Sequence, residues 1–381
     1  MRARSTTGVL VGLAVAVQLA LSACSWTSDA EPRPDILKGS APAAVQIAVT
    51  PAPGTNGVPI TTEIGMQINN GKVAGVKLVD TAGQEVAGEM REDGSSWVPA
   101  SPLRPDARYT ATVTAVGPGD TNSVRQTTFT TGARPSGRSI RSDLILTNGG
   151  TYGVGMPIVV QFGSDVPVGA RAAIEKRLFV KSDPPQPGAW RWFGARQVMY
   201  RPASFWQAGT KITARKALNS VQIGDRVGDT DFTAAITIGR SFVMDIDNAT
   251  KQMTVRQDGA VVRTVPVSLG KASTPTSSGT TVIMSREAAT VFRTPEYTTP
   301  VQYAMRLTWG GQYIHAAPWS VGDQGKRNVS HGCTNVSMAN ARWLYQNTLV
   351  GDPVITRNTQ RRLEVGDGWT VWDMDWSQYH A

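Results

Sequence analysis

Short apolar runs alternate with polar and turn residues along most of the chain, and this spacing is typical of β-strands joined by turns. Glycine and proline residues separate the runs. Between residues 44 and 132 the pattern predicts an immunoglobulin-like β-sandwich. Its candidate strands are Val45–Val49, Thr62–Ile68, Val76–Val79, Tyr109–Val116 and Gln126–Thr130.

A second stretch, residues 138–238, repeats this pattern after a joint at residues 133–137. The segment Leu103–Val113 is echoed by Tyr200–Thr213, because in each a proline turn leads into an extended run. One short helix is expected at Ala170–Leu178. Neither stretch contains a histidine or a cysteine. We therefore predict two sandwich modules without chemistry of their own, which act as spacers or docking surfaces.

The tryptophans of the second module allow two interpretations. Trp190, Trp192 and Trp206 could form a face on which sugar rings stack, or they could belong to the core. Large aromatic side chains at such spacings are more often core residues, so we favour the core interpretation.

A third, β-rich domain is expected over residues 239–358. A hairpin is indicated by Phe242–Ile246 and Met253–Val255, and a helix by Met338–Asn347, for which Ser337 is the candidate N-cap. The segment 270–279 is a turn-rich loop. Residues 285–301 lack clear periodicity and are expected to form a loop or lid.

A C-terminal extension follows at residues 359–381. Trp369, Trp372, Trp376 and Tyr379 are spaced so that they would share one face of a short helix. We expect this face to cover an apolar patch of the third domain.

The N-terminus predicts export. Residues 1–23 have basic residues before an apolar run that is short for a membrane span, as in a secretory signal peptide. The run ends before Cys24 with small residues, which resembles a bacterial lipobox. An ordinary signal peptide with an incidental cysteine is the alternative. A lipid on Cys24 would anchor the protein to the outer face of the cell membrane, with residues 24–43 as a tether.

Composition supports a mainly β, soluble protein, since 40% of the residues are hydrophobic and the chain contains 38 glycines and 23 prolines. The formal net charge is +9, but the basic residues are scattered, which argues against a nucleic-acid partner. A basic solvated surface is the simpler interpretation, and attraction to an anionic wall is the other.

The candidate chemistry lies in a short window. The chain has only three histidines and two cysteines, and this window contains His315, His331 and Cys333. An imidazole can take the proton of a thiol and so generate a nucleophile. His331 is only two residues from Cys333, whereas His315 can approach on a neighbouring strand, so His315 is our candidate base. The N–H groups of Gly332 and Cys333 could form an oxyanion hole.

The window allows two other interpretations. His331 and Cys333 could simply be packed core residues. A zinc site would need further ligands, which would have to be carboxylates such as Asp323. Neither a metal nor a cofactor is expected.

The motif Ser330-His331-Gly332-Cys333-Thr334-Asn335, with Ile314-His315 before it, resembles the signature of the L,D-transpeptidases with a YkuD-type catalytic domain. The layout from the lipobox to the tail resembles actinobacterial members with two immunoglobulin-like modules. The resemblance implies a peptidoglycan enzyme. Its cysteine attacks a stem tetrapeptide, releases D-alanine and makes a 3→3 cross-link, and it is acylated by carbapenems.

The resemblance also implies roles for individual residues. Cys333 is the nucleophile, His315 is the base, oriented by the carbonyl of Ala316, and His331 is a supporting residue. The positions that match the substrate pocket are Tyr297, Trp319, Ser330 and Asn335, with Gly310 and Gly311 as backbone contacts. Two alternatives stay open: an L,D-carboxypeptidase, which passes the acyl group to water, and a wall-binding lipoprotein with a vestigial site.

Overall fold

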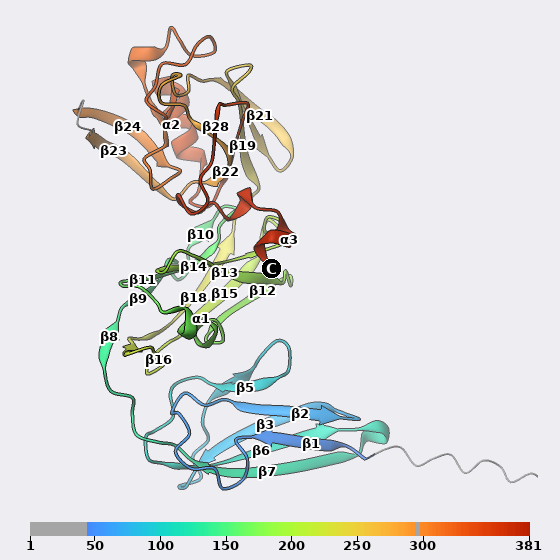
Figure 1. The fold of residues 1–381 in the computed structure, drawn as a ribbon. Helices are drawn as coiled ribbons and strands as arrows, with labels where there is room; N and C mark the ends of the chain where they lie inside the picture. Colours follow the sequence, from blue (N-terminus) through green and yellow to red (C-terminus); the bar gives the residue numbers. More distant parts are fainter. Residues whose placement is uncertain (1–43, 294–297) are drawn as a thin grey trace, which may run out of the picture. The chain divides into compact units, whose positions relative to one another are not determined.

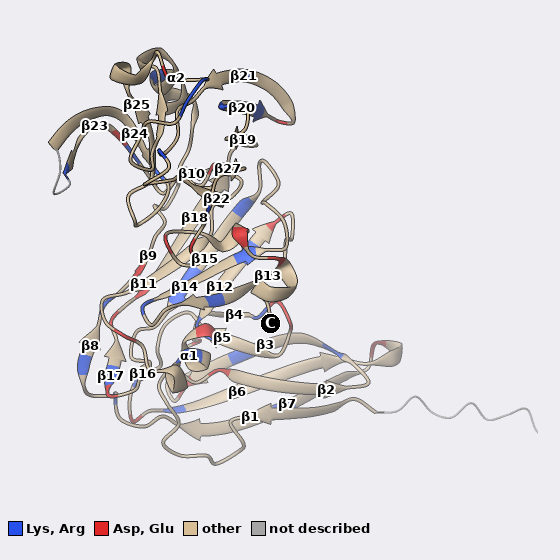
Figure 2. Ribbon diagram, turned by 45° about the horizontal axis from the view of Figure 1, so that its top comes forward, with Lys and Arg blue, Asp and Glu red and all other residues tan. Residues whose placement is uncertain are grey.

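The computed structural model describes residues 44–293 and 298–381, which form mostly β-structure (Figure 1). The expected signal peptide, Cys24 and the tether lie outside the described residues, and so does Tyr297. Within the described ranges, no helix is both long and apolar enough to cross a membrane. Lys and Arg are spread over many elements rather than gathered on one (Figure 2).

The first module is a two-sheet sandwich, as predicted. In β6 every second residue is buried, beginning with Tyr109, so that one face of the strand forms the core together with Leu78 and Phe129. One sheet contains β1 (Gln46–Thr50), β2 (Ile64–Asn69), β5 (Ser96–Pro99) and β4 (Gly88–Met90), and the other β3 (Lys72–Asp80), β6 (Arg108–Val116) and β7 (Asn122–Thr130).

The second module is also a sandwich of two sheets. One is β10 (Thr151–Tyr152), β18 (Asp231–Ile238), β15 (Lys211–Ala217) and β12 (Leu178–Asp183), and the other β13 (Gly188–Phe193), β14 (Gln197–Pro202), β11 (Ile158–Phe162) and β9 (Ser142–Leu144). A small sheet joins β16 (Gln222–Ile223), β17 (Arg226–Gly228) and β8 (Arg138–Ile140). The predicted helix is α1 (Val168–Glu175).

Trp206 of the second module belongs to the core, and Trp190 and Trp192 are partly buried and pack against it. Trp206 is buried and donates its indole N–H to the carbonyl of Met156 at 2.8 Å. Trp192 stacks on Phe162, and Trp190 packs against Tyr200. The favoured core interpretation is therefore correct for Trp206, whereas Trp190 and Trp192 lie at the edge of the core.

The third domain is built from two sheets and one helix. The larger sheet has the order β21 (Ala260–Pro266), β20 (Gln252–Gln257), β19 (Phe242–Asp247), β27 (Pro353–Arg357), β22 (Ser277–Val282) and β28 (Arg361–Arg362). The smaller has the order β23 (Ser285–Arg293), β24 (Thr298–Arg306), β25 (Tyr313–Ala316) and β26 (Thr334–Val336). Helix α2 (Met338–Asn347) begins as predicted, because the Ser337 hydroxyl accepts the N–H of Asn340.

Most of the segment 285–301, expected to be a loop or lid, belongs to two paired strands, and residues 294–297 lie outside the described residues. β23 and β24 form an antiparallel ladder from Ser285–Arg306 to Arg293–Thr298. Many of the side chains of β23 are half-buried or exposed, without regular alternation. A strand that is solvated on both faces has no need of period-two hydrophobicity, so the sequence carried no strand signal here.

The C-terminal extension does not form one helix on the third domain. It contains a 3-10 turn at Val371–Asp373 and the single-turn helix α3 (Trp376–Tyr379). Its first part contacts the third domain, where Asp373 accepts the N–H of Thr280. Its end packs on the second module, so the expectation of a patch on the third domain alone was wrong.

Arg201 of the second module explains this packing. Its guanidinium carbon lies 4.8 Å from the ring centre of Trp372, 5.3 Å from that of Trp376 and 4.3 Å from that of Tyr379. The Tyr379 hydroxyl donates to the Met199 carbonyl at 2.7 Å. A buried cation among aromatic faces holds the tail more specifically than an apolar patch would.

Candidate active site

His315 lies on β25, between β24 and β26, and is only 4% exposed. Its Nδ1 lies 2.9 Å from the carbonyl oxygen of Ala316. A carbonyl can only accept, so Nδ1 carries the proton and Nε2 presents a lone pair. Phe292 packs edge-on against the ring with 5.2 Å between ring centres. The imidazole is thereby held in one orientation, with the nitrogen that a base needs left unprotonated.

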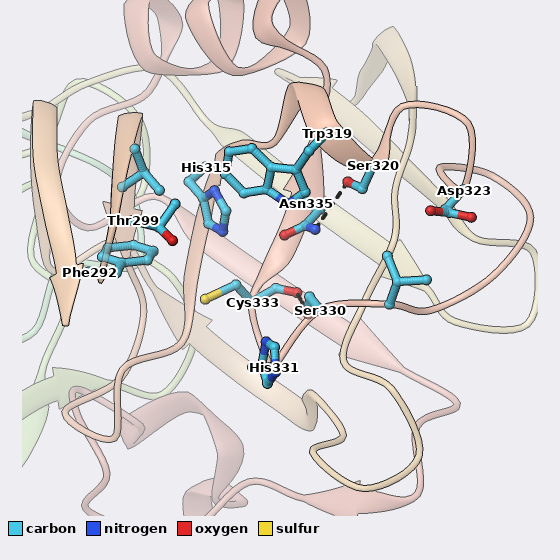
Figure 3. Close-up of a pocket in the computed structure, with 12 residues that line it drawn as sticks. Phe292, Thr299, His315, Trp319, Ser320, Asp323, Ser330, His331, Cys333 and Asn335 are labelled. Atoms are coloured by element: carbon cyan, nitrogen blue, oxygen red, sulfur yellow. Dashed lines mark hydrogen bonds between the residues drawn. The ribbon is translucent and has the colours of Figure 1, made fainter. Parts of the chain in front are cut away.

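Cys333 immediately precedes β26, which pairs in parallel with β25. In that ladder His315 is opposite Asn335, two residues after Cys333, so the side chains of the nucleophile candidate and the base candidate project from the same face of the two paired strands. Figure 3 shows the sulfur and the imidazole at the same cavity. The thiol contacts the Gly311 carbonyl oxygen at 3.6 Å.

Burial favours the neutral forms of both groups. It raises the pKa of the Cys333 thiol to about 11, against an opposing hydrogen bond with the backbone of Tyr313. Burial also lowers the pKa of His315 below its usual value, against the opposing hydrogen bond to Ala316. Near neutral pH the free protein therefore holds a thiol beside a neutral imidazole, rather than a preformed thiolate–imidazolium pair.

The segment before Cys333 is tightly held. Gly332 has a φ of +126°, a left-handed conformation that favours glycine. Its N–H donates to the Ser330 hydroxyl at 3.1 Å, and that hydroxyl donates to the Cys333 carbonyl at 2.6 Å. The expected oxyanion donor at Gly332 is therefore already engaged, because a backbone N–H has a single hydrogen to share.

His331 is exposed at the mouth of the same cavity. Its Nε2 lies 3.2 Å from the Lys271 ammonium, which can only donate. Its position beside Cys333 fits a supporting role rather than that of the buried base.

A cavity of about 540 Å³ connects these groups. Of the residues predicted from the sequence, His315, Trp319, Ser330, His331, Cys333 and Asn335 line it. Gly311 contacts the thiol through its carbonyl, and the N–H of Gly310 donates to Asp367 at 2.5 Å. The side chain of Asn335 donates to Ser320 at 3.1 Å (Figure 3).

Sequence reasoning missed several lining residues. These are Phe292, Thr299, Val301, Ser320, Asp323 as a pocket residue, and Val329. The first three come from the β23–β24 hairpin, for which the sequence showed no strand period. Asp323, which was considered as a zinc ligand, forms an ion pair with Arg327.

Two family descriptions match the chain. The L,D-transpeptidase catalytic domain matches residues 241–356, and the bacterial Ig domain matches residues 55–222. L,D-transpeptidase 2 of Mycobacterium tuberculosis (strain CDC 1551 / Oshkosh) is 34% identical over 341 residues, which are 86% of this chain and 82% of that protein.

Further relatives agree with these matches. L,D-transpeptidase 5 of Mycobacterium tuberculosis (strain ATCC 25618 / H37Rv) is 31% identical over 390 residues, 97% of this chain and 82% of that protein. A solved L,D-transpeptidase in complex with imipenem is 30% identical, covers 58% of this chain and 100% of its own, and has a TM-score of 0.49. The chain belongs to the L,D-transpeptidase family, enzymes that transfer acyl groups by means of a cysteine.

Proposed function

We propose that the protein is a peptidoglycan L,D-transpeptidase that makes 3→3 cross-links through a thioester on Cys333. The observation that carries this proposal is the meeting of a thiol and a correctly oriented imidazole at one cavity, within a chain of this family. The donor is a stem tetrapeptide, and its terminal D-alanine is the leaving group.

In the first half-reaction, the Cys333 sulfur attacks the carbonyl carbon between the third and fourth stem residues. The thiol proton passes to Nε2 of His315, and the carbonyl oxygen becomes an oxyanion. The C–N bond then breaks, His315 returns the proton to the departing amine of D-alanine, and the thioester is left. Because burial favours the neutral thiol and imidazole in the free protein, the proposal places this proton transfer after substrate binding.

In the second half-reaction, the side-chain amine of another stem attacks the thioester carbon. His315 takes a proton from this amine, the C–S bond breaks, and His315 passes the same proton to the departing sulfur, which becomes the thiol again. The product is an amide cross-link between two third residues. His315 thus acts first as base and acid for the donor and then as base for the acceptor.

The cavity walls supply the proposed substrate contacts. Trp319 is 59% exposed and offers an aromatic face beside His315, at 6.1 Å between ring centres. Ser330 and Asn335 contribute polar groups to the lining. Gly310 and Gly311 would contact the stem through their backbone, and Ala316 acts through the carbonyl that orients His315.

The cross-linking activity is tested with a disaccharide tetrapeptide. The wild-type protein should release D-alanine and form a dimer, both detected by mass spectrometry, and Cys333→Ala should produce neither. Tripeptide without dimer would instead identify an L,D-carboxypeptidase. Full activity of the Cys333→Ala protein would refute the thioester mechanism.

The role of His315 is tested by carbapenem acylation, which we propose also occurs at Cys333. His315→Gln should slow the appearance of the imipenem adduct by about 10²- to 10⁴-fold, the usual contribution of a general base. In the wild type the rate should fall as the pH drops through the lowered pKa of His315, where the imidazole becomes protonated. An unchanged rate in His315→Gln would transfer the role of base to His331.

The charge state of the free thiol is tested by alkylation. Because the pKa of Cys333 is raised to about 11, its modification by iodoacetamide should be slow at pH 7 and should still be rising at pH 9. Peptide mass analysis at Cys333 gives the rate at each pH. A plateau below pH 7 would show that a thiolate–imidazolium pair exists before substrate binds.

We further propose that the protein acts at the cell wall, exported and anchored by a lipid on Cys24, so that the tether and the two modules carry the catalytic domain outward. Family membership supports a place of action in the wall, and the lipobox-like sequence supports the anchor. Cys24→Ala should move the protein from the membrane to the soluble fraction on fractionation. An unchanged distribution would contradict lipid anchoring at this residue.

A further inference from the structure

We propose that Thr276 is a positioning residue that aims the backbone N–H of Cys333 at the developing oxyanion. This inference deepens the thioester mechanism proposed above and rests on it. Thr276 lies in the turn-rich loop before β22, far from the cysteine motif in sequence, and it does not line the catalytic cavity.

The loop that carries Thr276 runs alongside the cysteine segment. Gly270 forms a parallel β-bridge with Ser330, and the Lys271 N–H donates to the Ser330 carbonyl at 2.9 Å. Thr274 adds a weaker side-chain contact to that same carbonyl at 3.3 Å. Gly270 must lack a side chain here, since a Cβ atom would come within 2.1 Å of the Thr274 carbonyl oxygen.

The Thr276 hydroxyl both accepts and donates a hydrogen bond, and so links this loop to the cysteine segment. It is 3% exposed, accepts the Gly270 N–H at 2.9 Å, and donates to the Gly332 carbonyl at 2.9 Å. A hydroxyl has a single hydrogen, so that hydrogen is committed to Gly332. The carbonyl of Gly332 is consequently fixed in direction by a buried group.

Fixing this carbonyl also fixes an N–H. The Gly332 carbonyl and the Cys333 N–H belong to one planar trans peptide, in which the two bonds point in opposite directions. The Cys333 N–H must therefore point away from Thr276. Cys333 lines the cavity and Thr276 does not, and we infer from this that the N–H on the side away from Thr276 faces the reacting carbonyl.

The other N–H of this segment cannot replace it. Gly332 donates its N–H to the Ser330 hydroxyl. Ser330 therefore holds the peptide before the Gly332 Cα, and Thr276 holds the peptide after it through the Gly332 carbonyl. In this segment, the Cys333 N–H is therefore the donor whose direction depends on Thr276.

Thr276 has no contact with the nucleophile itself. The sulfur interacts with the Gly311 carbonyl and with the Tyr313 backbone, both on a different segment. Loss of the hydroxyl should therefore weaken stabilisation of an oxyanion without changing the thiol. Two reactions separate these effects: imipenem acylation passes through a tetrahedral oxyanion, whereas alkylation by iodoacetamide displaces iodide and forms none.

The experiment compares both reactions on full-length protein, by intact mass. Thr276→Val should slow imipenem acylation by about 10²- to 10³-fold, as expected for an oxyanion donor, with the alkylation rate of Cys333 unchanged. Thr276→Ser keeps the hydroxyl and should restore acylation. Thr274→Val is the matched control, because it removes a hydroxyl from the same loop but leaves the Gly332–Cys333 peptide held, and it should acylate like the wild type.

Two results would overturn the inference. One is unchanged acylation of Thr276→Val, and the other is an equal loss of acylation and alkylation, which would indicate general disorder of the loop. If the valine variant does not fold, Thr276→Ala removes the same hydroxyl without a branched side chain and gives the same comparison. Failure of wild-type protein to form any adduct would instead refute the proposed function.

Discussion

The parallel pairing of β25 with β26 is the constraint on which the candidate site depends. The ladder places His315 opposite Asn335, and Cys333 stands just before the paired segment. Parallel strands need a long connection, and here it is the loop through Trp319 and Asp323, which also lines the cavity. The same connection that makes the pairing possible therefore supplies the walls around the nucleophile.

Burial gives this site its chemical character. The raised pKa of the candidate nucleophile Cys333 and the lowered pKa of the candidate base His315 both favour the neutral form in the free protein over a resting ion pair. A protonated thiol also reacts slowly with oxidants, because the thiolate is the reactive form. Under the proposed export, the cysteine would face an oxidising compartment, and this would be a physical reason to generate the thiolate only when substrate is present.

The C-terminal extension connects the turn at Gly310 and Gly311 with the second module. Its Asp367 accepts the N–H of Gly310, next to the glycine whose carbonyl contacts the Cys333 thiol. Twelve residues later Tyr379 packs on Arg201 and bonds to Met199. Arg201 itself is 2% exposed, so removing the aromatic tail would uncover a desolvated cation. The tail therefore belongs to both domains, which explains why aromatic residues recur in it.

The sequence alone determined the sandwich modules, the helix α2 with its Ser337 cap, and the candidate nucleophile and base. Alternating hydrophobic positions, a helix-capping residue and the rarity of histidine and cysteine can all be recognised in the sequence without knowledge of the fold. Tertiary structure decided four other features. These are the hydrogen bond of Thr276 to Gly332, the hydrogen bond of Gly332 to Ser330, the pairing of β23 with β24, and the packing of the C-terminal tail on the second module. Each of these features depends on groups that are distant in sequence, or on backbone hydrogen bonds that do not depend on the identity of the side chain. No periodicity or motif in the sequence could therefore predict them.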